Sequence, residues 1–282
     1  MHPRLFDFGI GATQELSLRV SVAGLVRVLI KNPEDGALML ALERKANIYK
    51  VGEGSIAEVK VQPFGGAVRI IDLDKIRELI GDFNFDSERS RSEQDFRLFI
   101  KPSTWMGLRE FCIETLNQPW NPFLESDPGR ELAEEFYDAL NVKLNQDQYL
   151  NKAVGTLIED NPSSTDNAHS KGSPTVRVYR IFEATITDPI LTNRILINSK
   201  SISKKDLYEL ALIDGQNGGK GRGNAVLVMP IREIIYYYQS LLPLDRNDPR
   251  QFKEYYFEST VPMILEGLTV PKYTISSDQN SV

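Results

Sequence analysis

The chain has 282 residues, of which 41% are hydrophobic and 26% are charged, a balance typical of a folded globular protein with one large or two small domains. Its formal net charge of -6 argues against an extended nucleic-acid surface, which needs a basic face. No apolar run reaches the roughly 18 residues of a membrane-spanning helix, and the N-terminus carries no pattern of a secretion signal. A single cysteine, Cys112, precludes an internal disulfide and indicates a reducing, cytoplasmic location.

Histidine is scarce, which narrows the chemistry that the chain could perform. His2 is terminal, and His169 falls in a polar stretch that is typical of a loop. Neither position favours a rigidly held base or zinc ligand, so Ser-His-Asp, Cys-His and His-rich zinc sites are not expected. An enzyme with this composition would depend on carboxylates, with Mg²⁺ or Mn²⁺ as the cofactor.

The first quarter of the chain predicts strands. Residues 16–31 are rich in β-branched side chains that alternate with polar ones, and the turn sequence NPEDGA leads to a returning strand over 38–44. A further strand pattern over 56–71 is broken by Pro63 and by the pair Gly65-Gly66. The segment 72–122 predicts a helix over 74–80, a charged loop over 86–94, a short strand over 96–100 and a helix over 105–116.

The second half predicts a different mixture of elements. A mobile loop over about 160–174 precedes a strand over 175–186, and the remainder is mainly helical, with helices over 204–213, 231–242 and 249–268 and a strand over 225–230. Residues 271–282 are expected to be a disordered tail. The element order predicts an α/β (α+β) fold, with one domain over 1–202 and a helical C-terminal extension over 203–270 packed on it.

The stretch DPGRELAEEFYDAL, residues 127–140, predicts a helix with two contrasting faces. Asp127 suits the N-cap and Pro128 the first helical position. Leu132, Phe136, Ala139 and Leu140 form an apolar stripe, whereas Glu131, Glu134, Glu135 and Asp138 gather on the other side. Two interpretations remain open: a solvated acidic face, favoured by the N-terminal helix dipole, or carboxylates that converge on a divalent cation.

Residues 130–135, RELAEE, resemble the Nudix superfamily, whose box contains R-E-U-x-E-E with U aliphatic. The resemblance implies an α/β/α sandwich and metal binding by Glu131, Glu134 and Glu135, with Arg130 orienting the cluster. It also implies hydrolysis of a nucleoside diphosphate linked to another group. The upstream glutamate and glycine of the box would fall on Pro122 and Leu116, and the simplest account is an insertion over about 72–122 before the box helix.

The layout is most similar to a divergent bacterial branch, the SMODS-associated Nudix-like domains found beside second-messenger nucleotidyltransferases. The sequences GGAV, DFRLF, STWMGLREF and SDPGRELAEEF carry this similarity, which spans residues 16–186. It raises an alternative function, a nucleotide-binding sensor in a stress or antiviral defence system that has lost efficient turnover. A purely structural role for the acidic helix is a third possibility.

Several residues outside the helix are candidates for the same site. Gly65 and Gly66 would let the backbone approach a substrate without a Cβ in the way. Arg44 could approach a diphosphate or simply end its strand, and Glu183 could activate water or be an outward strand residue balanced by Arg180. Glu125 could replace the missing box carboxylate or decorate a loop.

Two other motifs do not carry a function. The glycine-rich stretch around Lys220 lacks the spacing of a phosphate-binding P-loop, so a flexible loop is the preferred interpretation. Tyr236, Tyr237 and Tyr238 would point in three directions on a helix and are interpreted as packing residues. The expected partner is a nucleotide-type small molecule, with no membrane and with a homodimer left open.

Overall fold

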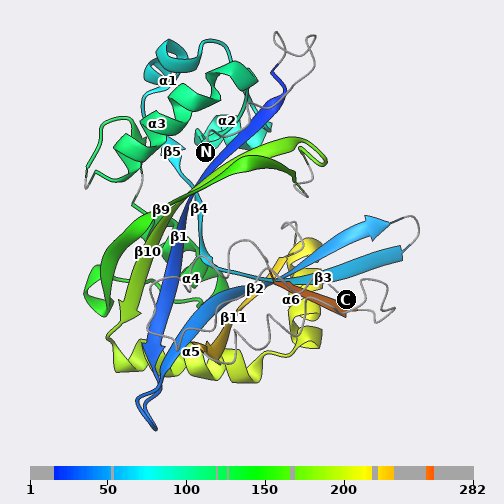
Figure 1. Ribbon diagram of the computed structural model, residues 1–282. Coiled ribbons are helices and arrows are strands. Elements are labelled where there is room, and N and C mark those ends of the chain that lie inside the picture. The colour runs from blue at the N-terminus through cyan, green and yellow to red at the C-terminus, as the bar shows by residue number, and fades with distance from the viewer. Residues whose placement is uncertain are drawn as a thin grey trace, which may run out of the picture. The chain divides into compact units, whose positions relative to one another are not determined.

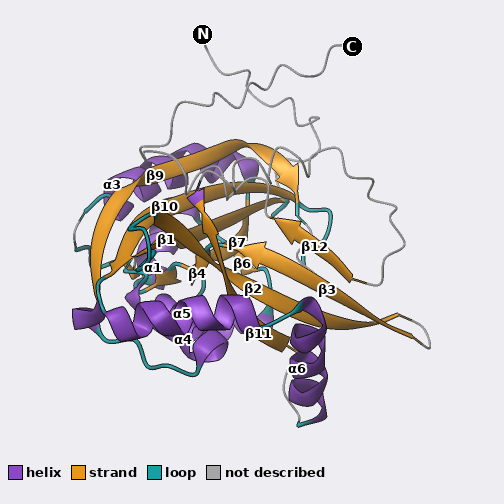
Figure 2. Cartoon of the chain, turned by 90° about the horizontal axis from the view of Figure 1, so that it is seen from below, coloured by secondary structure: helices purple, strands orange, loops and turns teal. Residues whose placement is uncertain are grey.

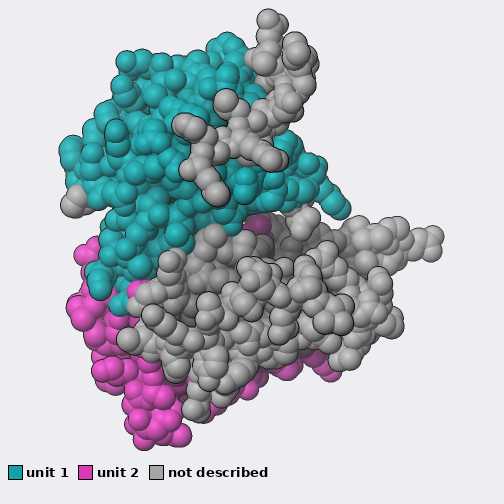
Figure 3. Space-filling view, viewed as in Figure 1, with its two compact units in different colours: residues 1–26, 64–134, 151–183 teal, residues 27–63, 135–150, 184–282 magenta. Residues whose placement is uncertain are grey.

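The computed structural model describes residues 16–51, 54–118, 120–125, 127–165, 169–217, 222–231 and 252–256. The chain forms two compact units, each built from three segments (Figure 3). Unit 1 comprises residues 1–26, 64–134 and 151–183, and unit 2 comprises residues 27–63, 135–150 and 184–282. Residue 202, where the sequence suggests a domain boundary, lies within unit 2. Helices and mostly antiparallel strands are both abundant (Figures 1 and 2), which confirms the α+β class.

Unit 1 is built around the first half of the long strand β1 (Leu18–Lys31). This half pairs antiparallel with β4 (Phe64–Ala67) and with β7 (Arg97–Ile100), and β6 (Asn84–Phe85) pairs with β7. The strands β9 (Tyr149–Ser164) and β10 (Pro174–Ile186) extend the sheet, and β5 (Arg69–Ile70) pairs separately with β8 (Leu124–Glu125). The register places Gly66 opposite Gly24.

Helices α1 (Leu73–Ile80) and α3 (Trp105–Leu116) pack together in unit 1 (Figure 1), and a short 3-10 helix, Pro102–Thr104, leads into α3. Alternate residues of the strands and the apolar stripes of these helices form one core, which includes Val20, Val22, Leu98, Ile100, Leu108, Leu116, Val176 and Val178. Burial of each large apolar side chain contributes about 1.5–3 kcal/mol. Cys112 belongs to this core, and burial raises the pKa of its thiol to about 12.

Unit 2 is centred on β2 (Leu38–Val51). This strand pairs antiparallel with the second half of β1, with β3 (Gly54–Gln62) and with β11 (Arg222–Pro230), while β12 (Phe252–Tyr256) lies parallel to β3. Helices α5 (Pro189–Ser201) and α6 (Lys204–Gln216) pack on β11, and α6 also packs on β2. Small residues at this contact, such as Ala46, Ala211 and Ala225, let the α6 backbone approach the strands closely.

Several predicted elements are confirmed within a few residues. They are the strands β1, β7 and β10, the helices α1, α3 and α6, and the turn over 32–37, which Gly36 closes with a φ of 72°. The strand predicted over 38–44 is longer than expected and continues to Val51. Helix α5 was not predicted, although Asp188 caps it by accepting hydrogen bonds from the amides of Ile190 and Leu191.

The prediction of a charged loop over 86–94 was wrong, because residues 88–93 form helix α2 (Glu88–Glu93). Ser87 caps the helix by accepting a hydrogen bond from the amide of Ser90. The charges that suggested a loop pair along the helix instead, Arg89 with Glu93 at 2.8 Å and Arg91 with Glu88 at 3.4 Å. Local propensity underestimates such a helix because its stability depends on these pairs and on the cap.

Two further predictions were wrong in part. A mobile loop was expected from residue 160, but β9 continues to Ser164, and Arg177 of β10 contacts Glu159 and Ser163 across the hairpin. Pro162 is tolerated there because β9 lies at the end of the strand order. Residues 252–256, predicted helical, form β12, so the extension over 203–270 is not purely helical. The predicted helix over 232–242 and the tail over 271–282 lie outside the described residues.

Across the described part of the chain, no helix combines the length and the apolar character needed to cross a membrane.

Candidate functional site at the acidic helix

Helix α4 (Gly129–Leu140) forms where the sequence predicts it. The side chain of Asp127 accepts a hydrogen bond from the amide of Gly129 at 2.8 Å, and the carbonyl of Pro128 accepts the first helical bond from Leu132, also at 2.8 Å. Leu132, Phe136 and Ala139 are buried, which confirms the apolar stripe. The start of the helix, up to Glu134, belongs to unit 1 and carries the first acidic residues.

Arg130 joins three carboxylates of unit 1. Its Nη2 lies 2.7 Å from Oε1 of Glu131, its Nη1 donates to Oε1 of Glu134 at 3.1 Å, and its Nε lies 3.6 Å from Oε2 of Glu125. Burial lowers the pKa of Arg130, but the field of these carboxylates outweighs that effect and raises it overall. The guanidinium therefore stays charged and holds the three acids together, as the resemblance implied for Glu131 and Glu134.

Glu131 lies directly against the glycine pair. A Cβ added to Gly66 would lie 2.5 Å from Cδ and 3.0 Å from Cγ of Glu131, and closer still to its Oε2. The carboxylate therefore occupies the space that any side chain at position 66 would fill. This contact joins the acidic helix to β4, two segments that are far apart in the sequence.

A small hollow in unit 1 surrounds this contact. It encloses about 220 Å³, part of it open to solvent. Its walls come from β1, β4, the segment around β8 and the start of α4, and its lining residues are Gly24, Gly66, Ala67, Val68, Glu125, Asp127, Pro128, Arg130 and Glu131. The acidic face of α4 thus borders a concave surface beside the glycine pair.

Burial and neighbouring charges alter the ionisation of Glu131. Burial raises the pKa of Glu131, and the charges of Glu134 and Asp95 raise it further, whereas Arg130 opposes them. Glu134, in contrast, has an exposed side chain. Within the described residues, no group of three or more His, Cys, Asp or Glu side chains is arranged to hold a metal ion by itself.

The structure brings together only part of the predicted site. Arg130, Glu131, Glu134 and Gly66 meet in unit 1, whereas Glu135 and Arg44 belong to unit 2, where the guanidinium of Arg44 donates to the carbonyl of Ile202 at 2.9 Å. Glu183 is a half-buried residue of β10 and does not line the hollow. Its suggested partner Arg180 instead donates to Asn117 at 2.8 Å.

Gly65 has a different role from its neighbour. Its φ is +131°, and a Cβ there would collide with the carbonyl of Gly24 and lie 3.0 Å from Cα of Leu25. The missing side chain therefore serves the close pairing of β4 with β1. Only Gly66 opens space for the acidic helix.

Sequence reasoning left the role of Glu125 open, and the structure places it in the site. Glu125 belongs to β8, lines the hollow and has one carboxylate oxygen fully buried. Its place five residues before Arg130 was the available signal, but only the pairing of β8 with β5 turns its carboxylate towards Arg130.

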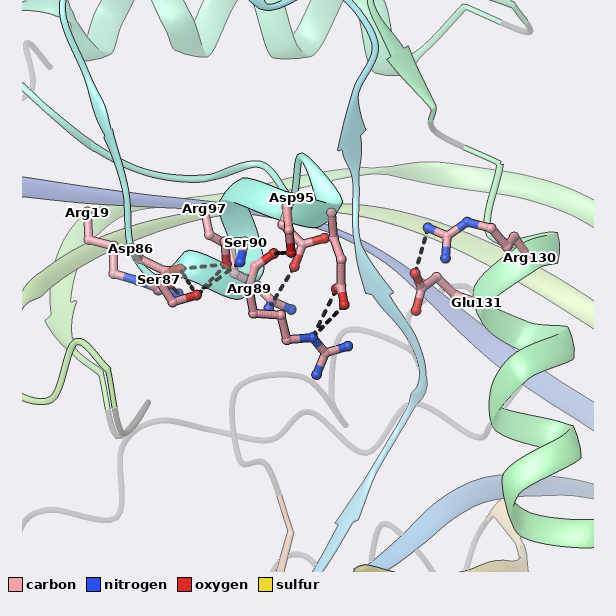
Figure 4. A network of polar contacts seen from close by, with 11 residues as sticks. Arg19, Asp86, Ser87, Arg89, Ser90, Asp95, Arg97, Arg130 and Glu131 are labelled. Carbon is pink, nitrogen blue, oxygen red and sulfur yellow. Dashed lines mark hydrogen bonds and ion pairs between the residues drawn. The ribbon is translucent and has the colours of Figure 1, made fainter. Parts of the chain in front are cut away.

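Helix α2 is held near the same region by a buried network. Asp86 accepts hydrogen bonds from Nε and Nη2 of Arg19, at 3.0 and 2.6 Å, and from the hydroxyl of Ser90 at 2.6 Å (Figure 4). Residue Asp95, just after this helix, is close enough to influence the titration of Glu131. No sequence motif indicated this network, because its members are separated by up to 67 positions.

Comparison with family models, with curated proteins and with solved structures found no match to this chain.

Proposed function

We propose that this protein is a divalent-cation-dependent hydrolase of the Nudix type, acting on a nucleoside diphosphate linked to another group. The proposal is supported by the position of the Glu131 carboxylate, which lies against Gly66. Arg130 joins this carboxylate to those of Glu125 and Glu134. Placing like charges together has a cost, which one arginine offsets only in part. A bound cation would offset the rest.

The carboxylates fit Mg²⁺ or Mn²⁺ in chemistry, since both are hard cations that prefer oxygen ligands. Each of Glu125, Glu131 and Glu134 directs one oxygen to Arg130, and the buried Oε2 of Glu125 has no hydrogen-bond partner among the described residues. The four side chains carry a net charge of about -2, which a divalent cation balances. Mg²⁺ is commonly held by one or two carboxylates together with water and substrate phosphates, so a closed cage of three acids is not required.

When bound, the cation would polarise a phosphoryl oxygen and lower the pKa of an attacking water. The chain's own residues would position these groups. Arg130 keeps the carboxylates in place, and Gly66 allows the backbone to approach the substrate. The proton of the attacking water would pass to Glu134, the exposed member of the acidic cluster.

The test is a hydrolysis assay with ADP-ribose, dinucleoside polyphosphates, NAD and nucleoside triphosphates, with and without Mg²⁺ or Mn²⁺. We expect cation-dependent turnover that Glu131→Gln and Glu134→Gln abolish. Asp138→Asn is the matched control, since Asp138 is an exposed acid of the same helix. Turnover that persists in Glu131→Gln, or that needs no divalent cation, would refute the proposal.

A nucleotide-binding sensor without efficient turnover is the second candidate function. It is favoured by the departures from the Nudix box, in which Pro122 and Leu116 stand where the box has its upstream glutamate and glycine. The resemblance to the SMODS-associated branch would place such a sensor in a bacterial defence system, in the cytoplasm. Thermal stabilisation by a nucleotide without any turnover supports this candidate, whereas a melting temperature that neither nucleotides nor cations change leaves only a structural role.

A further inference from the structure

Arg69 is the central residue of a row of charged side chains beside the hollow. The pairing of β5 with β8 places it directly opposite Glu125, and an isolated bridge on its other side places it opposite Asp95. Directly opposed residues of an antiparallel pair share one face of the sheet, with Cβ atoms about 4.5–5.5 Å apart. Arg69 therefore lies on the same face as Glu125, which lines the hollow.

Both acidic neighbours of Arg69 already have another arginine. Asp95 is paired with Arg97 at 3.1 Å, and Glu125 is paired with Arg130 at 3.6 Å. Among the described residues, the exposed side chain of Arg69 makes only a long hydrogen bond, 3.4 Å, to Oε1 of Gln94. Among the described residues, the guanidinium of Arg69 therefore forms no ion pair, although its strand neighbours are two acidic residues.

Other exposed arginines of unit 1 behave differently. Arg77, Arg89 and Arg91 each form an ion pair with an acid of their own helix, namely Asp74, Glu93 and Glu88. Such pairs explain these arginines as features of solvated helices. No equivalent local partner explains Arg69.

We propose that Arg69 binds a phosphate group of the ligand at the edge of the hollow. This inference rests on the proposed function for the identity of the ligand, a diphosphate compound. A guanidinium presents two parallel N–H donors that match two phosphate oxygens, and an exposed side chain held by one long hydrogen bond can turn to meet them. Carboxylates on one side and a free guanidinium on the other would receive a diphosphate together with its divalent cation.

A small phosphate ligand fits better than a polyanion. The carboxylates of Glu125 and Glu131 would repel a bare anion, so binding at this edge should be strengthened by a cation that bridges them to the phosphate. A nucleic-acid surface requires an extended basic face, whereas the acidic residues Glu125 and Glu131 line this hollow.

The experiment measures binding of inorganic pyrophosphate and of ADP by isothermal titration calorimetry, each with Mn²⁺ present and absent. The full chain is compared with Arg69→Gln, Arg69→Lys and Arg91→Gln, the last being a matched control that removes the same charge from an exposed position of the same unit. We expect Arg69→Gln to weaken pyrophosphate binding about 10- to 100-fold, as for loss of a charge-assisted hydrogen bond. Arg69→Lys should recover part of the affinity, and Arg91→Gln should stay within about twofold, since rim charges contribute little.

Each outcome bears on the inference. Equal affinities of Arg69→Gln and Arg91→Gln, or no pyrophosphate binding by the unaltered protein, overturn it. If Arg69→Gln selectively loses pyrophosphate binding while no substrate is hydrolysed, the hydrolase proposal fails and the phosphate site stands. If a substrate is hydrolysed and Arg69→Gln leaves the rate unchanged, the phosphate site at Arg69 fails and the hydrolase proposal stands. Tighter binding of ADP than of pyrophosphate identifies a nucleotide as the source of the phosphate. Melting temperatures within about 2 °C would show that the variants remain folded.

Discussion

Alanine substitutions at the two adjacent glycines of β4 should have opposite consequences. At Gly65, a methyl group would meet the backbone of β1, with Leu25 Cα and Gly24 C at 3.0 Å and the Gly24 carbonyl oxygen nearer still. At Gly66, the methyl group would meet the Glu131 side chain, with Cδ at 2.5 Å. Backbone in a paired sheet cannot move aside, whereas a glutamate side chain can change rotamer. Gly65→Ala should therefore damage the fold, and Gly66→Ala should damage the site.

These contacts determine how much each alanine should lower the free energy of unfolding. Gly65 has a φ of +131°, so alanine there adds backbone strain of about 1–3 kcal/mol to an overpacking cost of about 1–3 kcal/mol. The sum of about 2–6 kcal/mol is a large part of a typical stability of 5–15 kcal/mol. Gly66→Ala displaces Glu131 from a partly exposed ion pair with Arg130, which is worth about 0–1 kcal/mol.

Urea denaturation followed by circular dichroism measures the first quantity, and calorimetric titration with Mn²⁺ measures the second. We expect Gly65→Ala to lower the free energy of unfolding by at least about 2 kcal/mol, with Gly66→Ala within about 1 kcal/mol of the unaltered protein. We also expect Gly66→Ala to lose Mn²⁺ affinity. Equal destabilisation by the two variants, or full Mn²⁺ affinity in Gly66→Ala, would refute the reasoning that Gly66 exists to seat the Glu131 carboxylate.

Two further predictions concern the buried charges of unit 1. Asp86→Ala should cost about 3–5 kcal/mol in urea denaturation, because it leaves the buried guanidinium of Arg19 unpaired. Burial raises the pKa of Asp86, but hydrogen bonds from Ser90 and Arg19 lower it overall. The ionised form of Asp86 therefore stabilises the fold when the pH is above the ordinary pKa of 3.8. This stabilisation is lost as the pH falls through the lowered pKa. The stability gap to Asp86→Ala should therefore narrow below about pH 3.8, and a gap that does not depend on pH would contradict this account. Glu131→Gln should leave the melting temperature in chelator unchanged or higher, since burial disfavours the carboxylate. It should also remove any rise in melting temperature that Mn²⁺ causes. If Mn²⁺ raises the melting temperature of this variant as much as that of the unaltered protein, Glu131 is not a ligand.

Elements with a strong local pattern were predictable. Helix α3 was expected over 105–116 and has those bounds, and β10 differs from its predicted range by one residue. Helix α4 was located from Asp127, Pro128 and the apolar stripe, all of which lie within a few turns of one another. Helix α2 was missed because its composition, ERSRSE, is as typical of a loop as of a helix, and the cap and ion pairs decide between them.

Residues that depend on non-local pairing were not predictable to the same degree. Glu125 and Asp95 acquire their places from the strand pairings on either side of Arg69, and no periodicity in the sequence encodes those pairings. Glu135 was grouped with the site on the strength of a motif, and Arg44 because of its place at the end of a predicted strand, yet both belong to unit 2. Glu183 lies on the strand β10 that the alternating pattern predicted, but that pattern does not show whether its side chain borders the hollow.

By itself, the sequence determined the α+β class, the acidic helix and the orientation of its apolar stripe, because these follow from composition and from contacts between residues a few positions apart. Tertiary structure decided that the carboxylate of Glu131 lies against Gly66, that Arg130 also contacts Glu125, and that Arg69 forms no ion pair within the part of the chain that the structure describes. These relations depend on strand register and close backbone approach between distant segments. Local propensity carries no information about either.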